Sequence, residues 1–200
     1  MRVGGMLSQS TVRFMVFRCY NVIKYYKNNN QENETMTGAN VYSGDYARSR
    51  GAYISDAKVT PTLTSGGTYA SGDYVGTSGT AMVFPVIEAG GGGYIVGGGV
   101  IDGAGASGVA CEIWVFDEII TPPADNAAWS ISDAHAKNKV AIIPISTFYA
   151  SALNNTGDGE PISPKHFISA SGNLYACVIT RGAPVFANGD ITVRLDGVSD

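Results

Sequence analysis

The sequence predicts an all-β protein, folded as a two-sheet antiparallel β-sandwich of a jelly-roll-like type. Glycine accounts for 26 of the 200 residues, while the eight prolines are ordinary in number, a composition typical of tight turns and strand ends. From Val59 onward, short apolar runs alternate with turn residues, and helical periodicity is limited to a turn near residues 125–136. With 44% hydrophobic and 15% charged residues, the chain can bury one ordinary core.

Four runs that contain apolar residues predict the first strands. Residues 58–64 alternate between polar and apolar, and residues 80–88 form the next strand, in which Pro85 indicates an edge or a bulge. Two shorter runs, residues 94–96 and 100–102, flank three glycines. We interpret these glycines as parts of strands and turns, because neither Gly-Lys-Ser/Thr nor a helical pattern follows to make a phosphate-binding loop.

The turn at residues 102–108 is expected to fold the chain back, as a hairpin, into a strand at residues 109–117. This strand is apolar on both faces apart from Glu112, which places it in the middle of the sandwich. Alternation puts Trp114 and Phe116 on one face. The other face carries Val109, Cys111, Ile113 and Val115.

The remaining strands are predicted at residues 139–145, 165–169, 173–180 and 190–195. The last of these alternates cleanly, as expected of a strand with one wet face. Its apolar face carries Ile191, Val193 and Leu195. Its polar face carries Thr192, Arg194 and Asp196.

The three cysteines, Cys19, Cys111 and Cys177, are widely spaced and include no CxxC pair, which disfavours a disulfide framework and a zinc site. Cys111 and Cys177 lie in apolar runs and are expected to be buried, inert thiols. A bridge between these two is the alternative. A reducing compartment fits this usage better than secretion does.

The balance of basic and acidic residues changes near Met36. Residues 1–35 carry five basic groups and two acids, whereas the rest of the chain carries eight basic groups and fifteen acids. We interpret residues 1–35 as a basic and polar N-terminal extension, residues 36–58 as an extended arm and residues 59–200 as the β-sandwich domain. One hypothesis makes residues 1–35 a translated leader, because Gln31-Glu32 can be encoded as a ribosome-binding sequence; a genuine N-terminal arm is the alternative.

Residues 125–135 gather two carboxylates, an amide and an imidazole, the groups of a metal or sugar site. A transition-metal site is disfavoured, because His135 is the only nitrogen ligand in this stretch. The plainer interpretation is that Asp125 caps a short helical turn and that Ser132 or Asp133 caps the next one.

No catalytic, cofactor-binding or metal-binding residue is assigned, and an enzyme is not expected, because neither Gly-x-Ser-x-Gly nor His-Glu-x-x-His occurs. Residues 155–160 have the composition of a calcium loop without its spacing, so we expect a surface loop. No Lys or Arg occurs between Val59 and Ala136, which disfavours a nucleic-acid partner. A membrane partner is not expected either, because no run has the ~18 apolar residues that a transmembrane helix needs.

The segment from about residue 58 to residue 200 contains a series of short motifs. They are Gly72-Asp-Tyr-Val-Gly76 before Met82-Val-Phe84, Glu112-Ile-Trp-Val-Phe-Asp117 followed by Pro122-Pro-Ala-Asp-Asn-Ala-Ala128 and Ser132-Asp133, then Leu174-Tyr175 and Val178-Ile-Thr-Arg-Gly182 leading to Asp190-Ile-Thr-Val-Arg-Leu195. Together they resemble small all-β virion structural proteins of tailed bacteriophages. The resemblance implies a homo-oligomer, with a trimer favoured, that is found in the virion after assembly in the bacterial host cytoplasm.

The function that this resemblance implies is head decoration or stabilisation, with the major capsid protein or other virion subunits as partners. The candidate subunit-contact arm consists of Tyr42, Tyr46, Arg48, Arg50 and Tyr53, because Tyr and Arg are enriched at the centres of interfaces. The alternative function is a carbohydrate- or receptor-binding sandwich of the phage tail.

In that alternative, the rings of Trp129, Tyr149 and Tyr94 would stack on sugar faces. The two functions use different residues, so the positions of these residues in the structure help to distinguish the functions.

Overall fold

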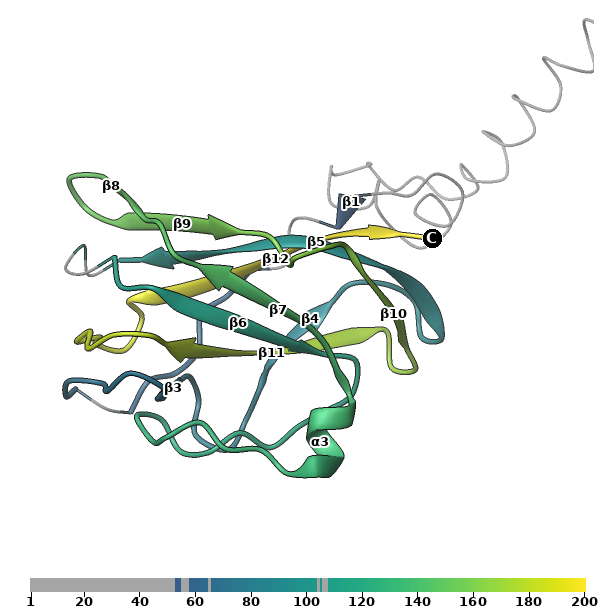
Figure 1. Ribbon diagram of the computed structural model, residues 1–200, viewed down its shortest axis with the longest axis horizontal. Helices are drawn as coiled ribbons and strands as arrows, with labels where there is room; N and C mark the ends of the chain where they lie inside the picture. Colours follow the sequence, from purple (N-terminus) through teal and green to yellow (C-terminus); the bar gives the residue numbers. More distant parts are fainter. Residues whose placement is uncertain (1–52, 55–57, 65, 104, 106–107) are drawn as a thin grey trace, which may run out of the picture. The chain divides into compact units, whose positions relative to one another are not determined.

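The computed structural model describes residues 53–54, 58–64, 66–103, 105 and 108–200, all of which belong to one compact unit. They form two antiparallel sheets that pack face to face (Figure 1). One short helix, α3 (Asp133–Lys137), occurs among the described residues. The predicted all-β sandwich is therefore confirmed, while its jelly-roll-like connectivity stays a prediction.

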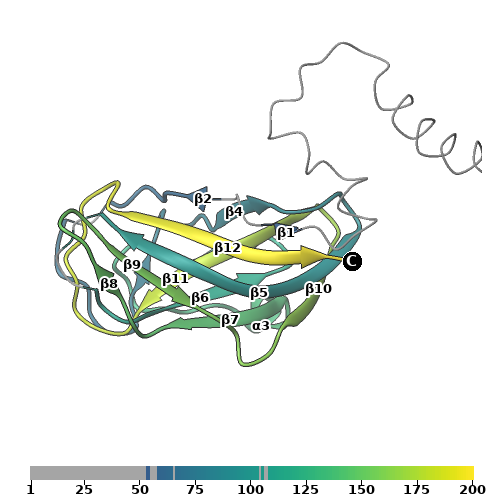
Figure 2. The same ribbon diagram turned by 90° about the horizontal axis from the view of Figure 1, so that it is seen from above.

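The larger sheet has seven strands in the order β1-β12-β5-β9-β8, with β2 also on β12 and β10 also on β5. Figure 2 shows β12 and β5 running side by side through this sheet, with β1 and β2 along the outer edge of β12. The strands are β1 (Tyr53–Ile54), β2 (Lys58–Val59), β5 (Gly91–Asp102), β8 (Tyr149–Ala150), β9 (Asn155–Gly159), β10 (Lys165–Ser169) and β12 (Ile191–Ser199).

The smaller sheet has five strands in the order β3-β11-β6-β7, with β4 also paired to β11. As predicted, β6 is a central strand, and β4, which ends at Pro85, lies at an edge. The strands are β3 (Tyr74–Val75), β4 (Met82–Pro85), β6 (Cys111–Phe116), β7 (Lys139–Ile145) and β11 (Asn173–Thr180).

The main core fills the space between the two sheets, because alternate residues of each strand point inward. The apolar face predicted for β12 is buried in this core, and so is the face of β6 opposite Trp114 and Phe116. Inward residues of β6 and β12 in the core are Cys111, Ile113, Val115, Ile191, Val193 and Leu195.

A second apolar cluster lies on the outer face of the five-stranded sheet, which we call the covered face. Outward side chains of β6 and β11, among them Phe116 and Cys177, pack there beneath residues 117–138, the segment that contains α3. The outer face of the seven-stranded sheet, which we call the open face, instead carries exposed apolar side chains and ion pairs.

The expected hairpin at residues 102–108 is wrong. Strand β5 belongs to the seven-stranded sheet and β6 to the five-stranded sheet, so the chain crosses from one layer of the sandwich to the other. The two predicted runs at 94–96 and 100–102 are instead parts of the single strand β5. Glycine weakens a strand but can occupy it, and pairing with β12 on one side and with β9 and β10 on the other holds this stretch extended.

The surface loop expected at residues 155–160 is also wrong, because residues 155–159 form β9 between β5 and β8. Its glycines are required by close packing. A Cβ atom on Gly159 would lie 2.2 Å from the Pro144 carbonyl oxygen, and one on Gly157 would lie 2.5 Å from Ile145. The glycines that resemble a calcium loop thus allow β9 to approach β7.

The sheet begins upstream of the boundary expected at residue 59. The backbone of Tyr53 pairs with Val198, and that of Lys58 pairs with Arg194, so β1 and β2 both lie along β12 of the same chain. The remaining residues of the candidate contact arm lie outside the described residues, as do the extension at 1–35 and most of the arm at 36–58. Those arm residues are Tyr42, Tyr46, Arg48 and Arg50.

Candidate interaction surfaces

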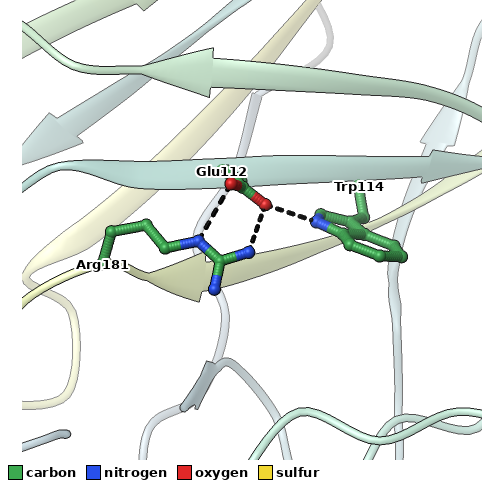
Figure 3. A network of polar contacts seen from close by, with 3 residues as sticks. All are labelled: Glu112, Trp114 and Arg181. Atoms are coloured by element: carbon green, nitrogen blue, oxygen red, sulfur yellow. Dashed lines mark hydrogen bonds and ion pairs between the residues drawn. The ribbon is translucent and has the colours of Figure 1, made fainter. Parts of the chain in front are cut away.

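A polar network crosses the covered face at the ends of β6 and β11 (Figure 3). The Arg181 guanidinium binds the Glu112 carboxylate through two bonds, Nε to Oε1 at 2.9 Å and Nη2 to Oε2 at 2.5 Å. The Trp114 indole N–H donates to the same carboxylate at 2.9 Å. Such bidentate Arg–carboxylate pairs are geometrically specific, so the network fixes the Trp114 ring.

The network also changes the acidity of its carboxyl group. The hydrogen bonds from Arg181, with a smaller contribution from Trp114, hold the pKa of Glu112 below its ordinary value of 4.5, against the opposing effect of partial burial. The carboxylate therefore stays ionised in the folded protein at neutral pH and below.

Two tryptophans meet next to this network. The Trp114 and Trp129 rings are 5.6 Å apart in an edge-to-face arrangement, and Trp129 also contacts Tyr74 with ring centroids 5.9 Å apart. The Lys139 ammonium lies 4.9 Å from the centre of the Trp114 ring, within the range of a cation–π contact. The half-buried Trp114 and Trp129 rings and the fully buried Tyr74 ring pack residues 117–138 against the sheet.

Asp125 ties this covering segment to the loops before and after β3. Its carboxylate accepts hydrogen bonds from the Tyr69 hydroxyl at 2.8 Å and the Thr64 backbone N–H at 2.8 Å, while its own N–H donates to the Ser78 hydroxyl. The expectation that Asp125 caps a helical turn is wrong, because its carboxylate is buried among partners distant in sequence. Of the two residues predicted to cap the next turn, Ser132 is the N-cap of α3.

The centre of the open face is an ion-pair cluster that spans three strands. Arg194 on β12, Gly99 on β5 and Asp158 on β9 stand in one cross-strand row. Because Gly99 has no side chain, the Arg194 guanidinium crosses β5 and binds Asp158 at 2.9 Å, while its Nε lies 2.9 Å from an Asp196 oxygen. Both carboxylates thus engage the one cation.

At one end of the open face lie four side chains that we call the Tyr94 patch: Tyr94, His166, Ile168 and Asp200. The Tyr94 and His166 rings meet edge to face at 5.1 Å, and His166 Nε2 lies 3.1 Å from an Asp200 carboxylate oxygen. A Cβ atom on Gly92 would lie 2.9 Å from Asp200 and 3.5 Å from Ile168. Glycine at this position therefore lets the Asp200 side chain lie close against β5.

At the other end lie three exposed side chains that we call the hairpin patch: Ile101, Tyr149 and Leu153. Tyr149 is opposite Thr156 of β9, and Thr156 is opposite Ile101 of β5, so the two apolar residues flank a threonine in one row. Leu153 lies in the turn of the β8–β9 hairpin and is 81% exposed, and Tyr149 is 70% exposed. The hairpin patch presents apolar surface with a hydroxyl at its centre.

The structure does not gather the three aromatic residues proposed to stack on sugars. Trp129 packs on the covered face, whereas Tyr94 and Tyr149 belong to opposite ends of the open face. Tyr94 and Ile101, the neighbour of Tyr149 in its row, are seven residues apart on β5, which corresponds to about 23 Å. The three rings therefore do not form one sugar site.

The two described cysteines are buried, free thiols on different faces of their sheet. Cys111 lies in the core between the sheets and Cys177 in the cluster on the covered face. Burial raises the pKa of Cys111 to about 12 and raises that of Cys177 as well. The prediction of buried, inert thiols is confirmed, and the alternative of a bridge between them is wrong.

One small cavity lies in the interior that the structure describes. A cavity of about 10 Å³ lies between the sheets and is lined in part by Asp102, Cys111 and Thr180, which is room for at most one water molecule. Within the part of the chain that the structure describes, no three His, Cys, Asp or Glu side chains are grouped to hold a metal ion. No helix in that part is long and apolar enough to cross a membrane.

Comparison of this chain with models of protein families, with curated proteins and with solved structures found no match. The surfaces described above are thus the basis on which a function is proposed.

Proposed function

We propose that this protein is a structural component of a tailed-bacteriophage virion, most simply a head decoration or stabilising protein that binds capsid subunits. The observation that carries the proposal is the hairpin patch, because it places exposed apolar side chains at one end of the open face. The resemblance of residues 58–200 to small all-β virion proteins supports the same class.

The hairpin patch has the composition of a protein contact. Burial of an exposed aromatic or aliphatic side chain stabilises a complex by about 1.5–3 kcal/mol before the cost of association. Tyr149 and Leu153 are two such side chains on one hairpin. The hydroxyl pair of Thr60 and Thr192, 2.7 Å apart at the edge of the same face, supplies polar groups of the kind found at the rim of interfaces.

Protein subunits fit this face better than phosphate does. The arginine at the centre of this face, Arg194, is engaged by two carboxylates, so it has little positive charge to offer to nucleic acid. We therefore propose that the partners are the major capsid protein or other virion subunits, including further copies of this chain in a trimer. The protein acts by contact, without catalysis or a cofactor.

The proposal is tested by counting the protein in purified virions by quantitative mass spectrometry. We expect a copy number near that of the major capsid protein. Only a few copies per particle would contradict the head position and favour the tail, and absence from intact particles would overturn the proposal.

Incorporation of variants locates the contact. Leu153→Asp together with Tyr149→Ser is expected to abolish incorporation, because a carboxylate would be buried without a partner. The matched control is Ile162→Asp, a fully exposed isoleucine in the turn between β9 and β10, which should incorporate normally. Loss of incorporation by the control alone would place the contact elsewhere.

A glycan-binding role at the tail is the second candidate, and the edge-to-face pair of Trp114 and Trp129 favours it. Aromatic rings stack on sugars, and the neighbouring Glu112, Arg181 and Lys139 side chains can hydrogen-bond to hydroxyl groups. Titration with capsule and cell-wall oligosaccharides should then shift the tryptophan fluorescence, and Trp114→Phe should weaken binding. No fluorescence change with any of them would remove this candidate.

A further inference from the structure

The turn that leads into β12 contains Asn188-Gly189, the only Asn-Gly pair in the sequence. Residues 187–189 are exposed, and the Asp190 backbone N–H donates to the Ala187 carbonyl oxygen at 3.2 Å to close the turn. Gly189 has a φ of +94°, and a Cβ atom built on it would meet no atom within 4 Å. The space beside the Gly189 backbone is therefore open.

The backbone nitrogen of Gly189 is available to react. Among the described residues, no hydrogen bond involves the Gly189 N–H. Glycine also has no side chain to hinder the approach of its nitrogen to a neighbouring carbonyl carbon. The residue after Asn126 differs in both respects, because Ala127 has a side chain and its N–H donates to the Ala124 carbonyl oxygen at 3.1 Å.

The Asn188 side-chain amide accepts a hydrogen bond that favours attack on its carbon. The Leu63 backbone N–H donates to Asn188 Oδ1 at 3.0 Å, and the Leu63 side chain is anchored in the main core. Attack on the amide carbon places negative charge on Oδ1, and a donor already fixed beside that oxygen stabilises the developing charge. Leu63 thus supplies one donor of the oxyanion-hole type.

We propose that Asn188 is a site of deamidation through a cyclic imide. The Gly189 nitrogen gives up its proton to hydroxide and forms a bond to Asn188 Cγ. The Cγ–Nδ2 bond breaks, and Nδ2 takes up a proton and leaves as ammonia. Water then opens the imide at one of its two carbonyl carbons, so the products at position 188 are aspartate and isoaspartate, and water is the only other reactant.

The modification changes the charge and the backbone at the entry to β12. Either product adds a carboxylate close to Asp190, whose own carboxylate accepts from the Ala187 N–H. Aspartate keeps an oxygen for the Leu63 N–H, whereas isoaspartate lengthens the main chain just before β12 begins at Ile191. This inference does not depend on the proposed virion function.

Timed incubation of the full-length protein tests the inference. The protein is held at physiological temperature and mildly alkaline pH, and samples are digested at acidic pH to stop the reaction. Liquid chromatography with mass spectrometry separates the asparagine, aspartate and isoaspartate forms, and each conversion adds about 1 Da. Asn126 in the same molecule is the internal control.

We expect Asn188 to convert at least about tenfold faster than Asn126, which corresponds to a barrier lower by about 1.4 kcal/mol. Isoaspartate should be among the products, because the imide opens at either carbonyl. Equal rates at the two asparagines, or conversion of Asn188 to aspartate alone, would overturn the inference.

A variant of the neighbouring glycine tests the nucleophile. Gly189→Ala places a methyl group beside the attacking nitrogen and should slow conversion of Asn188 about tenfold. Because alanine is strained at a φ of +94°, the two proteins are also compared in guanidinium chloride, where the fold makes no difference. An unchanged rate in the variant under both conditions would show that the Gly189 nitrogen does not attack.

Denaturation of the parent protein tests the role of Leu63. Unfolding removes the Leu63 N–H from Asn188 Oδ1, so conversion of Asn188 should be about threefold slower in guanidinium chloride than in the folded protein. Conversion at the same rate or faster in the denatured chain would contradict the assignment of Leu63 as the stabilising donor.

Discussion

The two outer faces of the sandwich differ in what lies on them. On the covered face, the outward residues of β6 and β11 are mostly apolar apart from Glu112, and residues 117–138 pack over the apolar ones in a second core. On the open face, β5 contributes glycines at 97 and 99, and Arg194 lies across them between two carboxylates. The covered face therefore stabilises the fold, whereas the open face remains accessible for contacts.

The largest expected change in the free energy of unfolding tests whether the apolar cluster on the covered face stabilises the protein as a core does. Phe116 is fully buried in its cluster, so Phe116→Ala should lower the free energy of unfolding by about 3–5 kcal/mol. The matched change on the open face, Tyr94→Ala, should cost under about 0.5 kcal/mol. Denaturant titration of both variants measures the difference, and equal costs would abolish the distinction between the faces.

The next effect concerns the attachment of the covering segment. Asp125→Ala removes the acceptor for the Tyr69 hydroxyl and the Thr64 N–H and should cost about 3 kcal/mol, because buried donors lose a charged partner. Tyr69→Phe removes one of these bonds and should cost about 1 kcal/mol. If thermal unfolding showed the two variants to be equally stable, Asp125 would not be the centre of this network.

Gly98 and Gly99 are adjacent on β5 and face opposite sides of the sheet, the core and the open face, so their substitution compares the two sides. A Cβ atom on Gly98 would lie 2.9 Å from the Arg194 carbonyl oxygen and 3.1 Å from Ile143, so Gly98→Ala should cost about 2 kcal/mol. At Gly99 the nearest atom is the end of the exposed Asp158 side chain, which can move. Gly99→Ala should therefore cost under about 1 kcal/mol, and the reverse order in denaturant titrations would contradict the assigned faces.

The smallest effect is the pH dependence that Glu112 contributes. Because its pKa is lowered in the folded state, its stabilising contribution is present above the ordinary value of 4.5 and is lost as pH falls through the lowered value. Glu112→Gln should lose stability at pH 7 and show a shallower decline between pH 5 and pH 2. A decline as steep as in the parent protein would assign the acid sensitivity to other carboxyl groups.

The strands were predictable where the side chains alternate or where an apolar run is bounded by turns. The predicted bounds of the strands at 139–145, 165–169 and 173–180 are confirmed, and the two faces of β6 follow from its period of two. These elements are determined by local pattern, which a single sequence contains.

The errors arose where distant contacts decide the structure. Gly97 and Gly99 interrupt the apolar pattern of β5, yet pairing on both sides keeps the strand continuous. The local sequence predicts a loop at Gly159, because it holds no sign of the close approach to Pro144.

The candidate surfaces were harder to predict than the strands. Arg194 and Asp158 are far apart in sequence, and only the register across Gly99 brings them together. The local sequence predicts a helix cap at Asp125, because its true partners, Thr64 and Tyr69, are also distant in sequence. A buried carboxylate in an otherwise ordinary polar loop carries no local signal of its role.

Hydroxyl-radical footprinting of the free protein and of the virion tests most directly whether the open face makes the contacts. We predict that oxidation of Tyr149 and Leu153 falls steeply in the particle, while oxidation of Trp114 on the covered face stays the same. Unchanged oxidation of Tyr149 and Leu153, with protection of Trp114, would contradict the account and make the covered face the contact surface.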